Sequence, residues 1–358
     1  MRTPKRLSGI ALIMTLLLLV VLVVIVGQFS YSTQVDSYVA QNSSEDLQLR
    51  YALISALNFA IAQIQLDAMQ EEGTQKKYDF LGDEWAREIW TPKNAQRIGT
   101  CSVYYTIQDE NGKFNLLRLL EKREKEEKEQ EEKEKEKEEE NKKSKSIPPD
   151  EQFDLLVDAI QNKKEVVQAS KLRESIVSWM KEKKGKSGNA EGPFPTKVPL
   201  FSMKELLMAK NVSSLVLFGA SNKLDPEQSF QGLIDHATVW SDGKININTA
   251  SQEVIKSLHS KIDDELAQRI VKYRQQEGTD GEKQCFKESA DIKKVEGINE
   301  GGEGNKSLYP EIEDLITVKS SYFSIVATAQ CGRIIKRLKS VVQRRGKRVY
   351  KLFCEYEE

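Results

Sequence analysis

The first 35 residues carry the feature that most constrains how this chain can fold. Three basic residues occupy the first six positions, and no charged residue follows until Asp36. The stretch Ile10–Val26 is almost entirely aliphatic, and about 20 apolar residues suffice for a helix to cross a bilayer. We therefore expect one transmembrane helix over residues 10–34. The rest of the 358-residue chain is polar and predicts a water-exposed body.

The charges on either side of this segment predict its orientation. Basic residues precede it, whereas Asp36, Glu45 and Asp46 follow it. Flanks rich in lysine and arginine stay on the cytoplasmic side of a membrane. The N-terminus is therefore expected to be cytoplasmic and the body to be exported.

A candidate processing site lies before the apolar segment rather than after it. Ser8 and Gly9 join the basic leader directly to Ile10, and a glycine leaves the next peptide bond unhindered for a peptidase. A secretory signal is instead cut after its apolar region, at small residues, and residues 27–32 form a poor site of that kind. The arrangement resembles a type IV prepilin leader, which implies removal of residues 1–9 by a prepilin peptidase and methylation of the new N-terminus. An ordinary uncleaved anchor is the alternative.

The fifth residue after this cut is Met14. Pilins typically carry glutamate there, which pairs with the N-terminus of a neighbouring subunit inside the membrane. A carboxylate in lipid costs several kcal/mol unless it is paired. If the chain is similar to pilins, Met14 implies a subunit that caps the assembly, because such a subunit has no neighbour ahead of it.

The region after the membrane segment predicts that the same helix continues. No proline occurs between Lys5 and Pro92. Apolar residues recur at intervals of three and four, which is a helical period: Leu47, Tyr51, Ile54, Leu57, Ile61, Ile64 and Ala68. We expect one helix of roughly 60 residues, the spine of a pilin.

Strands and a charged segment follow this helix. Residues 84–90 and 100–108 predict short strands, and Asp109–Gly112 is a turn sequence before a further strand at 113–116. An α+β fold with an antiparallel sheet is expected. From Glu121 to Lys145, 22 of 25 residues are charged, 12 acidic and 10 basic, so this segment has nothing to bury and is interpreted as a spacer.

The middle of the chain predicts helices, and its end predicts strands. Apolar stripes indicate helices over 153–161, 165–181 and 202–209. Three alternating segments close the chain after residue 317, with glycines near their bends. The simplest architecture is a pilin domain split by a large all-α insertion, whose sheet is completed by the closing strands.

Within the insertion, residues 245–276 predict a helical hairpin. Asn248 begins a capping sequence in which Thr249 and Gln252 have the spacing of a capping box. Asp263 then opens the second helix. We interpret the hairpin as a packing or partner element.

The four cysteines, Cys101, Cys285, Cys331 and Cys354, lie in the exported part. Their wide spacing indicates neither a zinc site nor a redox motif. An oxidising compartment permits disulfides, and Cys331 and Cys354 are placed to face each other in a hairpin. Small buried apolar residues are the alternative interpretation.

In this order, the motifs resemble those of the type II secretion minor pseudopilin K (general secretion pathway protein K) family over nearly the whole chain. They are Gly9-Ile10, Met14, Asp109–Leu116, Phe201–Leu206, Gly243–Ala250 and the closing strands. The resemblance implies a non-enzymatic inner-membrane subunit with a periplasmic body. It also implies that the subunit joins two other minor pseudopilins at a pseudopilus tip, starts assembly, and contacts exported proteins or the outer-membrane channel.

The resemblance implies the following division of the chain: leader 1–9, transmembrane helix 10–34, first part of the pilin domain 35–120, charged spacer 121–152, helical insertion 153–316, and closing strands 317–358. Members of the family commonly bind calcium in the insertion, after a helix that contains tryptophan. In the matching stretch Trp179–Gly185, lysines stand where carboxylates are needed. Glu182 and Glu191 alone do not supply the six to eight oxygens that calcium takes, so no metal and no cofactor is expected.

Other functions are weighed against this one. A minor pilin of a type IV pilus or competence system fits the same leader. The hairpin at 245–276 also resembles the helix-hairpin-helix of membrane-anchored DNA receptors, but its turn lacks glycine and carries Asp263 and Asp264, so no nucleic acid is expected. The two histidines lack the spacing of metal ligands, and the sequence has no nucleophile or phosphate-loop motif, which argues against an enzyme.

The basic residues near the C-terminus are interpreted as one solvated face, with an acidic partner or lipid headgroups as alternatives. They are Lys336, Arg337, Lys339, Arg344, Arg345, Lys347 and Arg348.

Overall fold

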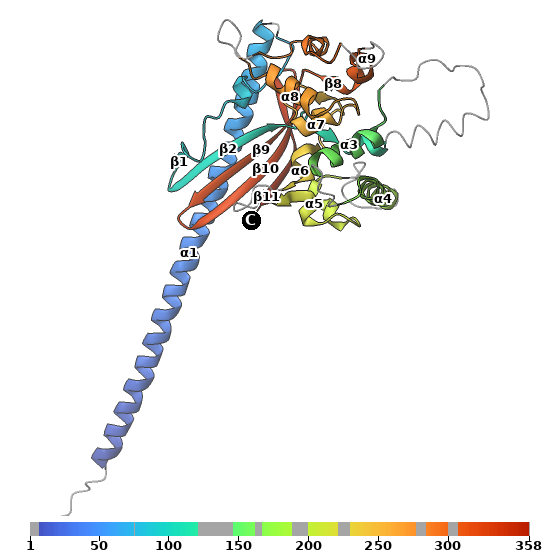
Figure 1. Ribbon diagram of the computed structural model, residues 1–358. Helices are drawn as coiled ribbons and strands as arrows, with labels where there is room; N and C mark the ends of the chain where they lie inside the picture. Colours follow the sequence, from blue (N-terminus) through green and yellow to red (C-terminus); the bar gives the residue numbers. More distant parts are fainter. Residues whose placement is uncertain are drawn as a thin grey trace, which may run out of the picture.

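The computed structural model shows a long helix that carries a folded body at one end (Figure 1). It describes residues 7–74, 76–120, 146–161, 167–187, 200–220, 230–276, 284–299 and 307–357. The charged segment 121–145 and the first six residues of the leader lie outside these ranges.

The helix α1 extends from Leu7 to Thr74 and has 68 residues, which confirms the predicted continuous helix. Its first half runs free of the body, and every side chain from Ile10 to Ser44 is exposed (Figure 1). Its second half packs against a sheet, with Leu49 as the first fully buried residue.

The packed half of α1 owes its close approach to the sheet to small side chains. Ala52, Ala56 and Ala60 are spaced four residues apart and are fully buried. Residues at this spacing share one helix face. Because alanine adds a single methyl group, the helix backbone comes close to the strands, and Leu53 and Leu57 fill the space beside it.

The sheet has five antiparallel strands in the order β1-β2-β9-β10-β11. Strand β9 pairs with β2, so the closing strands complete the sheet that begins near residue 96, as predicted. The strands are β1 (Gln96–Ile98), β2 (Cys101–Asp109), β9 (Tyr322–Cys331), β10 (Ile334–Arg345) and β11 (Arg348–Glu357).

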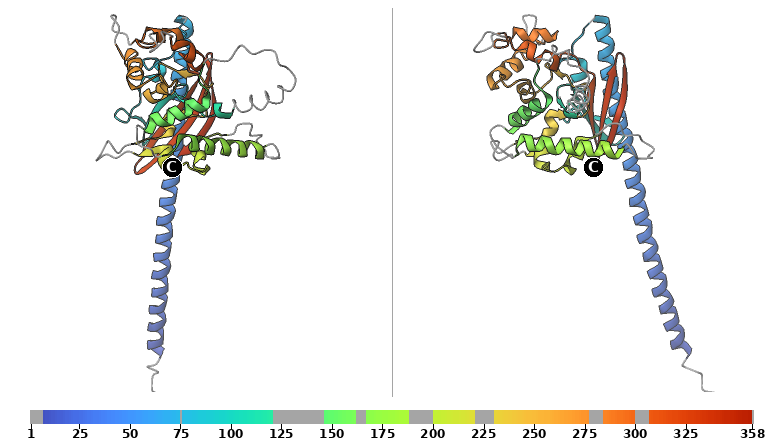
Figure 2. Two further views of the ribbon diagram at one scale, coloured as in Figure 1. Left: turned by 45° about the vertical axis from the view of Figure 1, so that its right-hand side comes forward. Right: turned by 90° about the vertical axis from the view of Figure 1, so that its right-hand side faces the viewer.

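The two faces of the sheet are covered by different parts of the chain. Phe323, Ile325 and Ala327 alternate along β9 and are buried with α1 in one core. The helical part of the chain lies on the opposite face (Figure 2). On that side the ring of Trp240 lies 6.1 Å from that of Phe353 on β11.

Two predictions about the first sheet are wrong. Residues 84–90 form no strand; instead the short 3-10 helix η1 (Glu84–Ala86) turns Trp85 into the core, where its ring lies 5.0 Å from that of Phe323. Strand β3 (Phe114–Asn115), which was expected in the antiparallel sheet of the first part of the pilin domain, does not join the sheet of β2. It pairs in parallel with β6 (Ala237–Thr238) and so joins the helical part.

The helical part consists of short elements around one apolar core that also includes Phe114 and Leu116. It contains two-residue strands as well as helices, namely β4 (Gly219–Ala220) with β5 (Phe230–Gln231), and β7 (Ile245–Asn246) with β8 (Ile316–Thr317). Its helical elements are α3 (Pro149–Gln161), α4 (Ala169–Ser187), η2 (Met203–Met208), α5 (Ser214–Phe218), α6 (Leu233–His236), α7 (Gln252–Lys256), α8 (Asp264–Tyr273), η4 (Ser289–Lys294), α9 (Tyr309–Ile312) and η5 (Glu313–Leu315).

Candidate functional site

The predicted processing residues lie at the beginning of α1. Gly9 and Ile10 belong to its first turn, and Met14 follows one turn later with 64% of its surface exposed. Among the described residues, α1 is the one helix long and apolar enough to cross a membrane. None of the described residues covers its apolar segment, whose side chains are exposed, as expected of a segment that lies in lipid.

A second uncovered surface continues along the packed half of α1. Tyr51, Ile54, Leu66 and Met69 face away from the sheet, and between 38% and 63% of each side chain is exposed. At 3.6 residues per turn these four positions fall within about 120° of arc, so they lie on one side of the helix. This face, the free face of α1, is an apolar surface in line with the membrane segment.

Where the sheet meets the helical part, two motifs of the sequence come together, Asp109–Leu116 and Gly243–Ala250. The side-chain oxygen of Asn111 accepts hydrogen bonds from the backbone amides of Ser321 and Tyr322, both at 3.0 Å. The backbone oxygen of Asn111 accepts one from the amide of Asn246 at 2.8 Å. The side-chain amide of Asn246 in turn donates to Ser320 at 2.7 Å. These motifs therefore act as a hydrogen-bonded joint between the two parts of the body.

Asp109 lies at the centre of this joint and is buried. Its carboxylate accepts hydrogen bonds from the hydroxyls of Thr249 and Ser320 and from the backbone amide of Asn111. Burial raises the pKa of Asp109 to about 6, although these hydrogen bonds oppose the rise. Thr249 therefore serves the joint, and this role explains why it does not cap a helix.

Gly112 allows the two motifs to approach this closely. A Cβ atom at this position would lie 2.9 Å from the hydroxyl oxygen of Thr249 and 3.3 Å from the backbone nitrogen of Ala250. Gly112→Ala is expected to lower the free energy of unfolding by about 1–3 kcal/mol, because backbone atoms would have to move. Thermal unfolding of the full-length protein in detergent measures this. Gly27→Ala is the control, since its Cβ meets nothing within 4 Å and should not lower the melting temperature.

The hairpin residues do not form the predicted capping box. Ser251 is the N-cap of α7, and its hydroxyl accepts a hydrogen bond from the amide of Val254. Gln252 is instead the first residue of the helix. Asn248 makes two hydrogen bonds of 2.9 Å to the backbone of Phe286 and ties the hairpin to the next segment.

The turn between α7 and α8 is poorly suited to phosphate. Asp263 is the N-cap of α8, as predicted, and its carboxylate accepts a hydrogen bond of 2.8 Å from the amide of Leu266. A carboxylate therefore occupies the end of the helix at which an anion would bind. Lys256 is paired with Asp264 at 2.7 Å, so this nearby cation is already neutralised.

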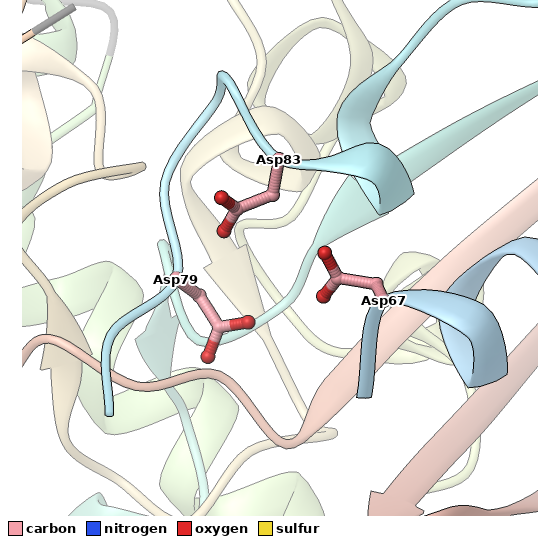
Figure 3. Close-up of side chains that lie close together, drawn as sticks. All are labelled: Asp67, Asp79 and Asp83. Atoms are coloured by element: carbon pink, nitrogen blue, oxygen red, sulfur yellow. The ribbon is translucent and has the colours of Figure 1, made fainter. Parts of the chain in front are cut away.

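A group of buried charges, which the sequence analysis did not identify, lies at the far end of α1. Figure 3 shows that Asp67, Asp79 and Asp83 point toward one another from α1 and from the loop that follows it. One oxygen of each carboxylate lies within 4.8 Å of the others, a spacing compatible with a metal ion. Arg344 of β10 donates hydrogen bonds to Asp67, at 2.9 Å, and to Asp79, while Lys76 pairs with Asp83. Each of the three carboxylates therefore already pairs with a cation of the protein.

Backbone amides donate further hydrogen bonds to these carboxylates. The amide of Ser320 donates to Asp79 at 2.7 Å, and the amide of Phe80 donates to Asp83 at 2.9 Å. Burial, and next the neighbouring Asp83, raises the pKa of Asp67 to about 6, against the attraction of Arg344. The cluster thus joins the end of α1 to its following loop, to the segment before β9, and to β10.

The prediction that the basic residues near the C-terminus form one solvated face is wrong. Lys336 pairs with Asp46 of α1, and Arg344 is buried in the aspartate cluster. Arg345, Lys347 and Arg348 are exposed at the turn between β10 and β11. The alternation of the strand, together with the loop ends, distributes these residues over separate environments.

The disulfide joins a pair of cysteines that was not predicted. Cys101 at the start of β2 is bonded to Cys331 at the end of β9, across 230 residues of sequence. Cys354 is exposed on β11 and lies opposite Ser340 of β10. The pairing of β9 with β2, rather than the C-terminal hairpin, decides which cysteines meet.

The two glutamates considered for calcium are not brought together in the described structure. In α4, Glu182 is exposed, and Glu191 lies outside the described residues.

Comparisons with known proteins agree with parts of this picture. Residues 241–301 match the family described as the helix-hairpin-helix motif, a range that includes α7 and α8. No curated protein matches the sequence. The structure is similar to a chain in the crystal structure of the GspK–GspI–GspJ complex of the enterotoxigenic Escherichia coli type 2 secretion system, with a TM-score of 0.57 and 15% sequence identity. The likeness covers 89% of this chain and 99% of that chain, so this chain shares its fold with a component of a type II secretion complex.

Proposed function

We propose that this chain is a non-enzymatic minor pseudopilin that lies at the tip of a type II secretion pseudopilus and starts its assembly. The observation that carries the proposal is the shared fold, which extends over 89% of the chain and includes α1 joined to the sheet. The position of Gly9 before the apolar segment supports it independently. In this role the protein supports export across the outer membrane without chemistry of its own.

The free face of α1 is the proposed contact with other minor pseudopilins. It carries four exposed apolar side chains, it continues the line of the membrane segment, and no described part of the chain covers it. The similar chain comes from a complex with two other secretion components. We propose two partners of the same kind here, each packing a long helix along this face. Met14 fits a subunit at the front of such a bundle, because no subunit ahead would pair a glutamate.

The proposed location is the inner membrane, with the N-terminus cytoplasmic and the body periplasmic. A prepilin peptidase would remove residues 1–9, and the body would reach toward exported proteins or the outer-membrane channel. The charge on the two flanks of the membrane segment supports this orientation.

The mass of the intact protein, extracted from its native inner membrane, tests the proposal. We expect a chain that begins at Ile10 and is methylated at its N-terminus. A Gly9→Leu variant should remain uncut, because a bulky residue obstructs the bond. A wild-type chain that still begins at Met1 would identify an ordinary anchor, and a cut near Ser30 would release the body from the membrane; both results contradict the proposal.

A DNA receptor is the second candidate, because residues 241–301 match the helix-hairpin-helix motif. The carboxylate of Asp263 at the end of α8 argues against it. DNA binding that weakens steeply with salt, and that is lost when Lys256 and Lys261 are replaced by glutamine, would favour the receptor. A minor pilin of a type IV pilus shares the leader and helix, and the identity of the co-purified partners distinguishes it.

A further inference from the structure

A basic hollow lies at the end of the body farthest from the membrane segment. Its volume is about 1000 Å³, and Ala68, near the end of α1, contributes to its wall. The remaining lining comes from three segments that are distant in sequence: residues 76–77, 319–321 and 343–348. We call it the distal basic cleft.

The charge of this cleft is strongly one-sided. Its lining includes the exposed residues Lys77, Lys319, Arg345, Lys347 and Arg348. Lys77, Lys319 and Arg348 take part in no ion pair within the part of the chain that the structure describes. A cleft lined by one sign of charge concentrates its field and attracts an oppositely charged partner.

Two buried or half-buried cations balance most of the charge of the aspartate cluster beside the cleft. Asp67 and Asp79 are held by Arg344, and Asp83 is held by Lys76. Their carboxylates are buried and point away from solvent toward these partners. The cluster therefore fixes the wall of the cleft, while Lys77, Lys319 and Arg348 stay exposed and outside any ion pair among the described residues.

A side chain in the wall of the cleft orients one of its exposed cations. Gln343 lines the cleft, and its side-chain oxygen accepts a hydrogen bond of 2.8 Å from Arg345. This bond orients the guanidinium at the rim. Arginine in a fixed orientation binds carboxylates in a two-pronged manner.

Other anionic partners fit this lining less well. Among the described residues, no aromatic side chain lines the cleft, so the bases of a single-stranded nucleic acid would have nothing there on which to stack. The described lining also lacks large apolar residues that insert into a bilayer, since Ala68 and Gly346 are its members without polar side chains. A concave site with polar walls suits an extended chain better than a flat lipid surface.

We propose that the distal basic cleft binds an acidic segment of another protein, with the carboxylates of the segment paired to Lys77, Lys319 and Arg348. The inference does not depend on cleavage of the leader. It gives the membrane-distal end of the body a recognition surface of defined charge, separate from the free face of α1.

The test uses the full-length protein in detergent and a fluorescent peptide of alternating glutamate and serine, followed by fluorescence anisotropy. We expect saturable binding that weakens as salt rises. The triple variant Lys77→Gln, Lys319→Gln, Arg348→Gln should weaken it at least about tenfold, which corresponds to about 1.4 kcal/mol. The control variant Arg97→Gln, Arg333→Gln, Arg337→Gln removes the same charge from exposed positions near the other end of the sheet and should bind like the wild type.

Three results would overturn the proposal. The first is that the peptide shows no saturable binding to the wild type. The second is that both triple variants lose binding equally, which would mean that only the net charge of the protein matters. The third is that vesicles of phosphatidylglycerol or a single-stranded oligonucleotide bind the wild type more tightly than the peptide does and lose binding in the cleft variant. A phosphate surface would then be the partner. All the substituted side chains are exposed, so equal melting temperatures will verify that each variant is folded.

Discussion

Arg344→Met is expected to lower the free energy of unfolding by about 3–5 kcal/mol, because it leaves buried carboxylates without their counter-ion. Arg344 is buried and donates to Asp67 and Asp79. Methionine preserves most of the volume but provides no charge. In thermal unfolding of the full-length protein, a loss of this size corresponds to a fall of roughly 10 °C in the melting temperature.

The pH dependence distinguishes loss of charge from poor packing. The pKa of Asp67 is already raised to about 6, and Arg344 is the neighbour that opposes this rise most. Without Arg344 the pKa should rise further, so that Asp67 binds a proton as the pH falls and no longer needs a counter-ion. The variant should therefore lose less stability at pH 5.5 than at pH 8.

Arg345→Met is the matched control, since it changes the same residue type at the next, exposed position. We expect its melting temperature to stay close to that of the wild type. If Arg344→Met melts like Arg345→Met at pH 8, the aspartate cluster does not stabilise the end of α1, and the interpretation of these contacts is wrong.

Loss of the Cys101–Cys331 disulfide should lower the free energy of unfolding about as much as Arg344→Met. The bond closes a loop with a sequence separation of 230 residues. In the chain-entropy description, a cross-link over such a loop stabilises the folded state by about 5 kcal/mol, because it restricts the unfolded chain. The double variant Cys101→Ala, Cys331→Ala should therefore melt far below the wild type, as should the wild type unfolded in the presence of a reductant.

Cys354→Ala tests whether the effect is specific to this pair. Cys354 is exposed and unbonded, so its replacement should leave the melting temperature unchanged. Peptide mapping without reduction should recover Cys101 and Cys331 in one linked fragment. A linked fragment that contains Cys354 instead would show that the C-terminal hairpin carries the bond.

The elements that the sequence predicted well are those whose pattern is local. The long helix follows from an unbroken apolar segment and from the three-and-four spacing after residue 45. Helix α8 begins after Asp263 as expected, because a side chain that caps a helix acts within three residues. The closing strands were recognisable from alternation, and their return to the first sheet followed from the order of helices and strands.

The features that were missed depend on contacts between distant segments. Residues 84–90 have a strand-like composition, but Trp85 is more favourably buried beside Phe323, and the chain turns there instead. The parallel pairing of β3 with β6 likewise depends on a strand more than 100 residues away. Local pattern does not contain this information.

The aspartate cluster had one local signal. Along β10, alternation places Arg344 on the same side of the strand as Leu338 and Val342, which face α1. An arginine at an inward-facing position predicts a buried acidic partner, because an unpaired charge is not tolerated there. The identity of the partners, Asp67 and Asp79, could not be inferred without the fold.

The order of the strands has a consequence for the synthesis of the protein. The central strand of the sheet, β9, and its neighbour β10 come from the end of the chain, while α1 and β2 come from its beginning. The apolar face of α1 around Ala56 therefore stays uncovered until the last strands have been made. The helical part has its own core and can form earlier. The half of the body that contains the sheet is thus the last to fold, and a nascent chain truncated before residue 322 would expose that face of α1 to other proteins.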